Sequence, residues 1–157
     1  MRDLSSKLFL EKIGVEKSKI QIATDCAFLK DFGDKKKSRE KILFVFHGAK
    51  FLDNNFQTIK NFIQNFSEKF EFLPLQKLQT GDQKIAEKLG VKPLNPGNLE
   101  EVVEIFQSAK LVISQRFHGI IFSILTETPF LAFSEMSKVK DFLASCDLTD
   151  FFIDQNF

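Results

Sequence analysis

Residues 111–122, Leu-Val-Ile-Ser-Gln-Arg-Phe-His-Gly-Ile-Ile-Phe, join a short apolar run to a second apolar segment through a polar turn. Leu111–Ile113 is typical of a strand buried on both faces, and we expect a helix at Phe117–Leu125. A second uninterrupted apolar run, Ile42–Phe46, predicts another buried strand. Buried strands that lead into helices are the pattern of an α/β fold with a parallel sheet.

The rest of the chain continues this alternation. Further helices are expected at Ser5–Ile13, Asn55–Phe70, Asp82–Leu89, Glu100–Ser108 and Lys138–Ser145, and further strands at Ile20–Ala23, Phe70–Leu75 and Phe130–Phe133. The polar stretch Lys30–Glu40 is expected to be a solvated linker. Because strands and helices alternate, we predict a Rossmann-like parallel sheet with helices on both faces, formed as a single domain over residues 1–157.

Composition excludes several classes of protein. The 157 residues carry 22 basic and 21 acidic side chains, so no electrostatic footprint for nucleic acid or an anionic membrane is present. The apolar runs fall far short of the roughly 18 residues of a membrane-spanning helix, and no metal-ligand spacing surrounds Cys26 or Cys146. We therefore expect a cytoplasmic globular domain with no structural metal and no cofactor.

Arginine is rare in this lysine-rich chain. Only Arg2, Arg39 and Arg116 stand beside 19 lysines. An arginine here is expected where the planar guanidinium fork is required, because a lysine cannot donate two parallel hydrogen bonds to one carboxylate or phosphate.

The turn after Ile113 has the features of an anion site. The free amides of a helix start attract anions, Arg116 adds a bidentate fork, and His118 adds a group that holds or moves a proton near neutral pH. Gly119 allows a ligand or another part of the chain to approach closely. The alternative is a capped helix in which Arg116 and His118 make structural hydrogen bonds.

Two further candidates follow predicted strands. His47 ends the strand Ile42–Phe46, and is either a ligand contact or a structural histidine. Asp25 follows Ile20–Ala23, and either caps a turn or lines the cleft. The glycine-rich nucleotide loops, the nucleophile elbow and the paired-histidine zinc motif are absent from the sequence.

The turn also resembles a known family. Ile113–Phe122 is similar to the Ser-x-Arg-Leu-His signature of the polysaccharide pyruvyl transferases. Arg2–Ser6 resembles the Arg-Asp-x-x-Ser segment of that family, and Thr24–Phe28 resembles its Asp-Pro-Ala-Phe segment, with Cys26 in place of proline. Gly81–Ala86 is similar to its helix that begins with aspartate.

Two positions depart from the family pattern. Ser134–Val139 stands where the family often has Ser-Tyr-Asp-Pro-Lys-Val, and keeps only its Ser134, Lys138 and Val139. His47 stands where relatives often carry an arginine.

The resemblance implies a fold and an activity. Family members have two Rossmann-like halves that face each other across a cleft, as in GT-B glycosyltransferases, and this chain resembles the C-terminal half. They transfer the pyruvyl group of phosphoenolpyruvate to a sugar diol of a cell-surface polysaccharide, forming a cyclic ketal. The implied partners are phosphoenolpyruvate, a glycan acceptor and an N-terminal domain missing from this chain.

The resemblance also implies the site. Arg2, Arg116 and His118 fall on positions of the phosphoenolpyruvate site, and Ser114 and Gly119 are counted with it because they share the motif. Arg116 and Arg2 are expected to clamp the anion, and His118 is the candidate acid or base. His47, Asp25 and Lys138 are additional candidates.

Two other functions remain open at this point. The chain is alternatively the nucleotide-sugar-binding half of a GT-B glycosyltransferase, with Phe117 lining a slot for the base. It is alternatively a non-catalytic binding domain that forms a homodimer through an exposed apolar face.

Overall fold

A computed structural model describes residues 4–23, 25–32, 38–47, 50–75, 81–134 and 137–153, and within the helix that begins at Lys50 it describes the side chains from Asn55 onward. Its centre is a sheet of four strands in the order β2-β1-β3-β4. The strands are β1 (Lys41–Val45), β2 (Lys69–Phe72), β3 (Ala109–Ser114) and β4 (Phe130–Ala132). Every pairing between them is parallel.

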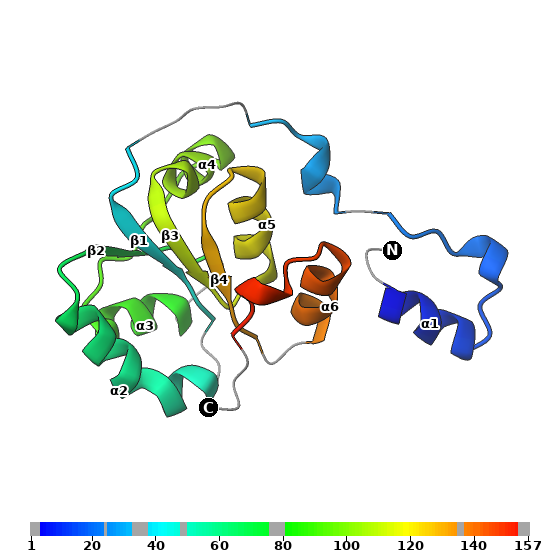
Figure 1. Cartoon of the computed structure of the whole chain (residues 1–157), viewed down its shortest axis with the longest axis horizontal. Coiled ribbons are helices and arrows are strands. Elements are labelled where there is room, and N and C mark those ends of the chain that lie inside the picture. The colour runs from blue at the N-terminus through cyan, green and yellow to red at the C-terminus, as the bar shows by residue number, and fades with distance from the viewer. Residues whose placement is uncertain are drawn as a thin grey trace.

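Helices cover both faces of this sheet, as Figure 1 shows. The helices are α1 (Leu4–Lys12), α2 (Lys50–Asn65), α3 (Gly81–Leu89), α4 (Leu99–Gln107), α5 (Phe117–Leu125) and α6 (Ser137–Ser145), with 3-10 turns at Lys17–Lys19, Cys26–Leu29 and Thr149–Phe151. Apolar side chains of α2 and α3 pack on one face, and those of α4, α5 and α6 pack on the other. The predicted α/β fold with a doubly covered parallel sheet is confirmed.

Strand β1 shows why the sheet lies in the middle. Leu43 and Val45 belong to the core cluster with α4, α5 and α6, whereas Phe44 and Phe46 belong to the cluster with α2 and α3. Successive side chains of a strand point to opposite faces, so an uninterrupted apolar run is stable only where both faces are covered. Phenyl rings fill the second cluster: the Phe44 ring lies 4.8 Å from that of Phe46 and is stacked at 5.4 Å on that of Phe70.

Two expectations about secondary structure were wrong. Ile20–Ala23 is no strand: Ile20 to Ala23 pair with no neighbour in the sheet, and Gln21, Ile22 and Ala23 are exposed. The predicted helix 55–70 ends instead at Asn65, and Lys69–Phe72 forms β2. Helical spacing of apolar residues continues through Phe66 and Phe70, but Phe70 is drawn into the sheet by its parallel pairing with Ile42.

The amino-terminal segment runs along the face formed by α4, α5 and α6. Phe28 and Phe32 contact the rings of Phe142 and Phe122, and Ser5 donates a hydrogen bond to Asp141 at 2.9 Å. Helix α1 itself lies beside α6 at the margin of the molecule (Figure 1) and has no buried residue. None of the helices in the described ranges has the length and apolarity that crossing a bilayer requires.

We expect Phe44→Ala to lower the unfolding free energy much more than Phe9→Ala, although both variants replace phenylalanine by alanine. Phe44 is 1% exposed between two other rings, so its loss leaves a cavity that costs about 3–5 kcal/mol of unfolding free energy. Phe9→Ala is the matched control, because Phe9 on α1 is 62% exposed and its change should stay within about 0.5 kcal/mol. Urea denaturation measures both, and equal losses would contradict the assignment of the core.

Candidate active site

The functional side chains gather where two chain connections leave the sheet in opposite directions. From β1 the chain passes to β2 on one side, and from β3 it passes to β4 on the other. In open parallel sheets this arrangement forms a crevice at the carboxyl ends of the two central strands, where ligands bind. Here the corresponding region, which we call the crevice, lies between the loop after Val45 and the loop after Ser114. A hydrogen bond from the Gln115 amide to the Val45 carbonyl at 3.0 Å joins the two loops.

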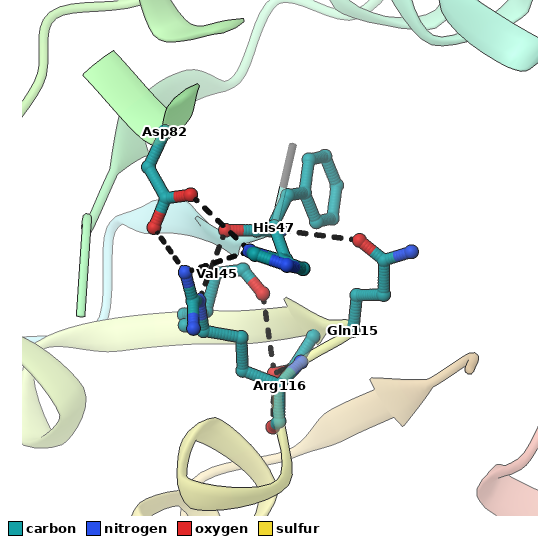
Figure 2. Close-up of polar contacts among 7 residues, drawn as sticks. Val45, His47, Asp82, Gln115 and Arg116 are labelled. Carbon is teal, nitrogen blue, oxygen red and sulfur yellow. Dashed lines mark hydrogen bonds and ion pairs between the residues drawn. The ribbon is translucent and has the colours of Figure 1, made fainter. Parts of the chain in front are cut away.

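Arg116 lies at the centre of this crevice (Figure 2). Its Nε donates to the Phe46 carbonyl at 3.3 Å, and one terminal nitrogen lies 2.5 Å from Oδ2 of Asp82 and 3.0 Å from Nδ1 of His47. The side chain is 19% exposed. Three acceptors around one planar group explain why this lysine-rich chain has an arginine here, since an ammonium group lacks that geometry.

Asp82 binds Arg116 from the start of α3 (Figure 2). It is the second residue of α3, and its side chain is only 7% exposed. Its other oxygen, Oδ1, lies 3.7 Å from Nδ1 of His47, so the carboxylate faces both the guanidinium and the imidazole. A buried carboxylate without such partners would be strongly destabilising. In the sequence, Asp82 is recognised only as the start of a helix. That helix follows β2, whose carboxyl end lies at the same end of the parallel sheet as that of β3, and this was the signal that could have found Asp82.

Gln115 is a second residue that the sequence analysis missed. It is buried, and its Oε1 accepts a hydrogen bond from the backbone N–H of His47 at 3.1 Å. This bond crosses the crevice and fixes the loop after β1 against the loop after β3. His47 is thereby brought next to Arg116, which confirms that the two strand ends meet.

Ser114 and Gly119 form the turn that carries Arg116. The Ser114 hydroxyl accepts the Arg116 N–H at 3.1 Å and donates to the Arg116 carbonyl at 2.9 Å. A Cβ on Gly119 would lie 2.3 Å from that hydroxyl and 3.0 Å from Cγ1 of Val45. Both residues are buried, so the structure gives them a packing role, and their contact with phosphoenolpyruvate stays a prediction.

His118 lies apart from the Arg116 contacts. It is exposed in the first turn of α5, and its imidazole meets the Phe117 ring edge-on at 5.9 Å. Nζ of Lys138, at the start of α6, lies 5.8 Å from the centre of the same ring. His118 and Lys138 therefore border one buried phenyl ring. Arg116 is the N-cap residue of α5, and its own side chain makes no capping hydrogen bond.

The other predicted residues have different positions. Asp25 accepts the Ala27 N–H at 3.1 Å and caps the 3-10 turn Cys26–Leu29, so of its two alternatives the structure shows the turn cap. Arg39 donates to the carbonyls of Thr126 and Glu127, at the end of α5. Arg2 lies outside the described residues.

A surface pocket elsewhere does not fit the predicted anion. It lies at the amino edge of the sheet and is lined by Lys41, Leu94, Asn95, Pro96, Glu101, Glu104, Ile105 and Ser108. Lys41 is already paired with Glu71, and two of the lining side chains are acidic, so the pocket repels anions. Among the described residues no group of three or more His, Cys, Asp or Glu side chains is arranged to hold a metal ion.

Comparison with known proteins agrees with this fold. The family model "Polysaccharide pyruvyl transferase" matches residues 1–137, which include the whole crevice. No curated protein matches the sequence. Among solved structures, the chain is similar to "E. coli heptosyltransferase WaaC with ADP-2-deoxy-2-fluoro heptose", with a TM-score of 0.51 and 17% identity over 81% of this chain. The match spans only 42% of that chain.

The parallel sheet and its crevice thus define an α/β domain with the architecture found in GT-B transferases. The chain belongs to the polysaccharide pyruvyl transferase family.

The contact between Gly119 and Ser114 generates a test of the turn. Gly119→Ala forces a methyl group against the buried Ser114 hydroxyl, and overpacking of this kind lowers the unfolding free energy by about 1–3 kcal/mol. Gly97→Ala is the matched control, because a Cβ there meets nothing closer than 3.6 Å. Thermal and urea denaturation compare the two variants. Equal stability would show that α5 does not pack this closely on β1 and β3.

Proposed function

We propose that this chain forms the C-terminal half of a polysaccharide pyruvyl transferase, which moves the pyruvyl group of phosphoenolpyruvate to two hydroxyls of a glycan as a ketal. Family membership over residues 1–137 supports the activity. The match to 42% of a glycosyltransferase chain is consistent with a partner half of similar architecture. The free cysteines Cys26 and Cys146 suit a reducing compartment such as the cytoplasm.

The observation that carries this proposal is the guanidinium of Arg116 at the crevice, inside the family's signature segment. Phosphoenolpyruvate carries a carboxylate and a phosphate, and both bind well to a planar fork. The start of α5 adds backbone N–H groups and the positive end of the helix dipole, and its N-cap residue Arg116 makes no capping bond with its own side chain. We assign Arg2, by its position in the family motif, to the same anion.

The reaction needs a proton at a defined carbon. The methylene carbon of phosphoenolpyruvate takes up a proton and becomes a methyl group, which leaves an oxocarbenium-like centre at the neighbouring carbon. The oxygen of one sugar hydroxyl bonds to that centre and loses its proton. His118 is exposed in the first turn of α5, and we assign it the transfer of one of these two protons.

Loss of phosphate and addition of a second hydroxyl complete the ketal. The bond from the central carbon to the phosphate oxygen breaks, and inorganic phosphate leaves with the electron pair. A second sugar hydroxyl then bonds to the same carbon and releases its proton. Of the two hydroxyl protons, one is balanced by the new methyl group and the other by the phosphate. We assign the attraction of the departing phosphate to Lys138, whose Nζ lies over the Phe117 ring that His118 also contacts.

We expect Arg116→Lys to weaken binding of phosphoenolpyruvate by about tenfold or more, because a point charge replaces a fork and one charge-assisted hydrogen bond is lost. Isothermal titration calorimetry measures the dissociation constant. Arg39→Lys is the matched control: it makes the same replacement where the guanidinium donates to the carbonyls at the end of α5, and should bind as the unaltered chain does. Equal affinity of both variants would reject the clamp.

Replacing His118 by Ala in the complete enzyme should lower turnover about 10²–10⁴-fold, since a positioned acid or base typically contributes that factor. Release of inorganic phosphate in the presence of acceptor glycan gives the rate. Because His118 is exposed, the melting temperature should not change. Turnover at the original rate would leave His118 without a chemical role.

A nucleotide sugar is the competing ligand. The similar heptosyltransferase is described with an ADP-heptose analogue, so titration of this chain with ADP-heptose belongs beside the titration with phosphoenolpyruvate. Heat from the nucleotide sugar and none from phosphoenolpyruvate would replace the proposal with a glycosyltransferase half.

A further inference from the structure

Arg116 is not a simple anion clamp, because Asp82 already binds its guanidinium. The Asp82 carboxylate lies 2.5 Å from Arg116, and with a side chain only 7% exposed it is shielded from water. A substrate carboxylate or phosphate must compete with this internal carboxylate for the same guanidinium. An anion site built in this way needs a means of satisfying Asp82 when the substrate arrives.

His47 is the group that can do so. Its Nδ1 lies 3.0 Å from a terminal nitrogen of Arg116 and 3.7 Å from Oδ1 of Asp82. A guanidinium nitrogen can only donate, so Nδ1 accepts from it and carries no proton in this arrangement. Once Nδ1 is protonated it can no longer accept from Arg116, and Asp82 Oδ1 is the acceptor that faces it.

The charges around His47 also favour its protonation when an anion binds. Among the described residues, the charged groups that face its imidazole are Asp82 from α3 and Arg116 from the turn after β3, and Gln115 adds only a neutral amide. With a neutral imidazole the three side chains sum to zero charge. With a protonated imidazole they sum to one positive charge, which attracts an anion. The side chain of His47 is 53% exposed, so solvent and ligand both reach it.

We propose that Asp82 is a positioning residue that passes from Arg116 to protonated His47 when an anion binds, so that the substrate enters together with one proton. In the empty site the carboxylate holds Arg116 in the crevice. In the occupied site the imidazolium satisfies the carboxylate, and Arg116 turns its donors to the substrate. This inference rests on the proposed function for the choice of phosphoenolpyruvate as the anion.

Proton uptake is the quantity that tests it. Calorimetric titration of phosphoenolpyruvate at about pH 7.5, where an ordinary imidazole is mostly neutral, is repeated in two buffers of different ionisation enthalpy. The difference in heat gives the number of protons taken up for each ligand bound. Phosphoenolpyruvate exchanges protons of its own, so the result is read as a difference between variants. The unaltered chain should take up as much as one proton more than His47→Gln.

The Asp82→Asn variant distinguishes a positioning role of Asp82 in proton uptake from a purely structural role. Asparagine keeps the shape but has no negative charge to stabilise an imidazolium, so proton uptake should fall toward the level of His47→Gln, and the double variant should fall no further than His47→Gln. Asp82→Glu keeps the charge and should restore part of the uptake. Asp150→Asn, at an exposed aspartate, is the matched control and should behave as the unaltered chain. Undiminished uptake in Asp82→Asn would overturn the proposal, whatever happens to affinity.

A measurement without ligand keeps this test separate from the proposed function. The chain has two histidines, so the spectrum of His47→Gln assigns both imidazoles by nitrogen-15 NMR. At high pH, Nδ1 of His47 should carry no proton, and a proton found there would overturn the inference. Failure of phosphoenolpyruvate to bind at any pH would reject the proposed function alone. The proton count is then repeated with inorganic phosphate, where equal uptake by the unaltered chain and His47→Gln would reject this inference.

Discussion

Main-chain hydrogen bonds between β1 and β3 bring together two loops that are far apart in the sequence. The Val45–Ser114 pairing ends the ladder, and the Gln115 side chain extends the contact by one more bond to the backbone of His47. Every side chain of the crevice depends on this pairing, because His47 follows one strand and Arg116 the other. The two buried faces of β1 explain why the pairing is stable: each is covered by its own layer of helices, and a shift of β1 by one residue would move Phe44 and Phe46 into the opposite layer.

Much of the fold could be predicted from local pattern. Ile42–Phe46 and Phe117–Leu125 were found because an apolar run of strand length and a helix after a turn are properties of neighbouring residues. Ile20–Ala23 was wrongly predicted to be a strand, because a strand needs a neighbouring strand and no pattern within four residues shows whether one is present. The site divides in the same way. Arg116 stands out in a single motif, whereas Asp82 and Gln115 gain their roles from partners on other elements, which only the assembled sheet brings close.

The two arginines in the described part of the chain show what the scarcity of arginine predicts. Both use the planar group to reach more than one acceptor: Arg39 bonds two carbonyls at the end of α5, and Arg116 bonds a carbonyl and a carboxylate. The need for a fork is therefore common to both. A link to the substrate is not common to both, because Arg39 donates to the end of α5, at the end of the sheet opposite the crevice. Scarcity alone identifies geometry, and the position at the strand ends distinguishes the site.

The close fit of Gly119 against Ser114 has a consequence for how this family can diversify. The turn after β3 is locked between buried atoms on both sides, so few substitutions there leave the fold intact. The described residues of the loop after β1, Phe46 and His47, are bonded to Gln115 and Arg116, and His47 is half in solvent. The two sides of the crevice therefore tolerate substitution unequally. Packing fixes the turn that carries Arg116, whereas the half-exposed position of His47 leaves room for new specificity to evolve.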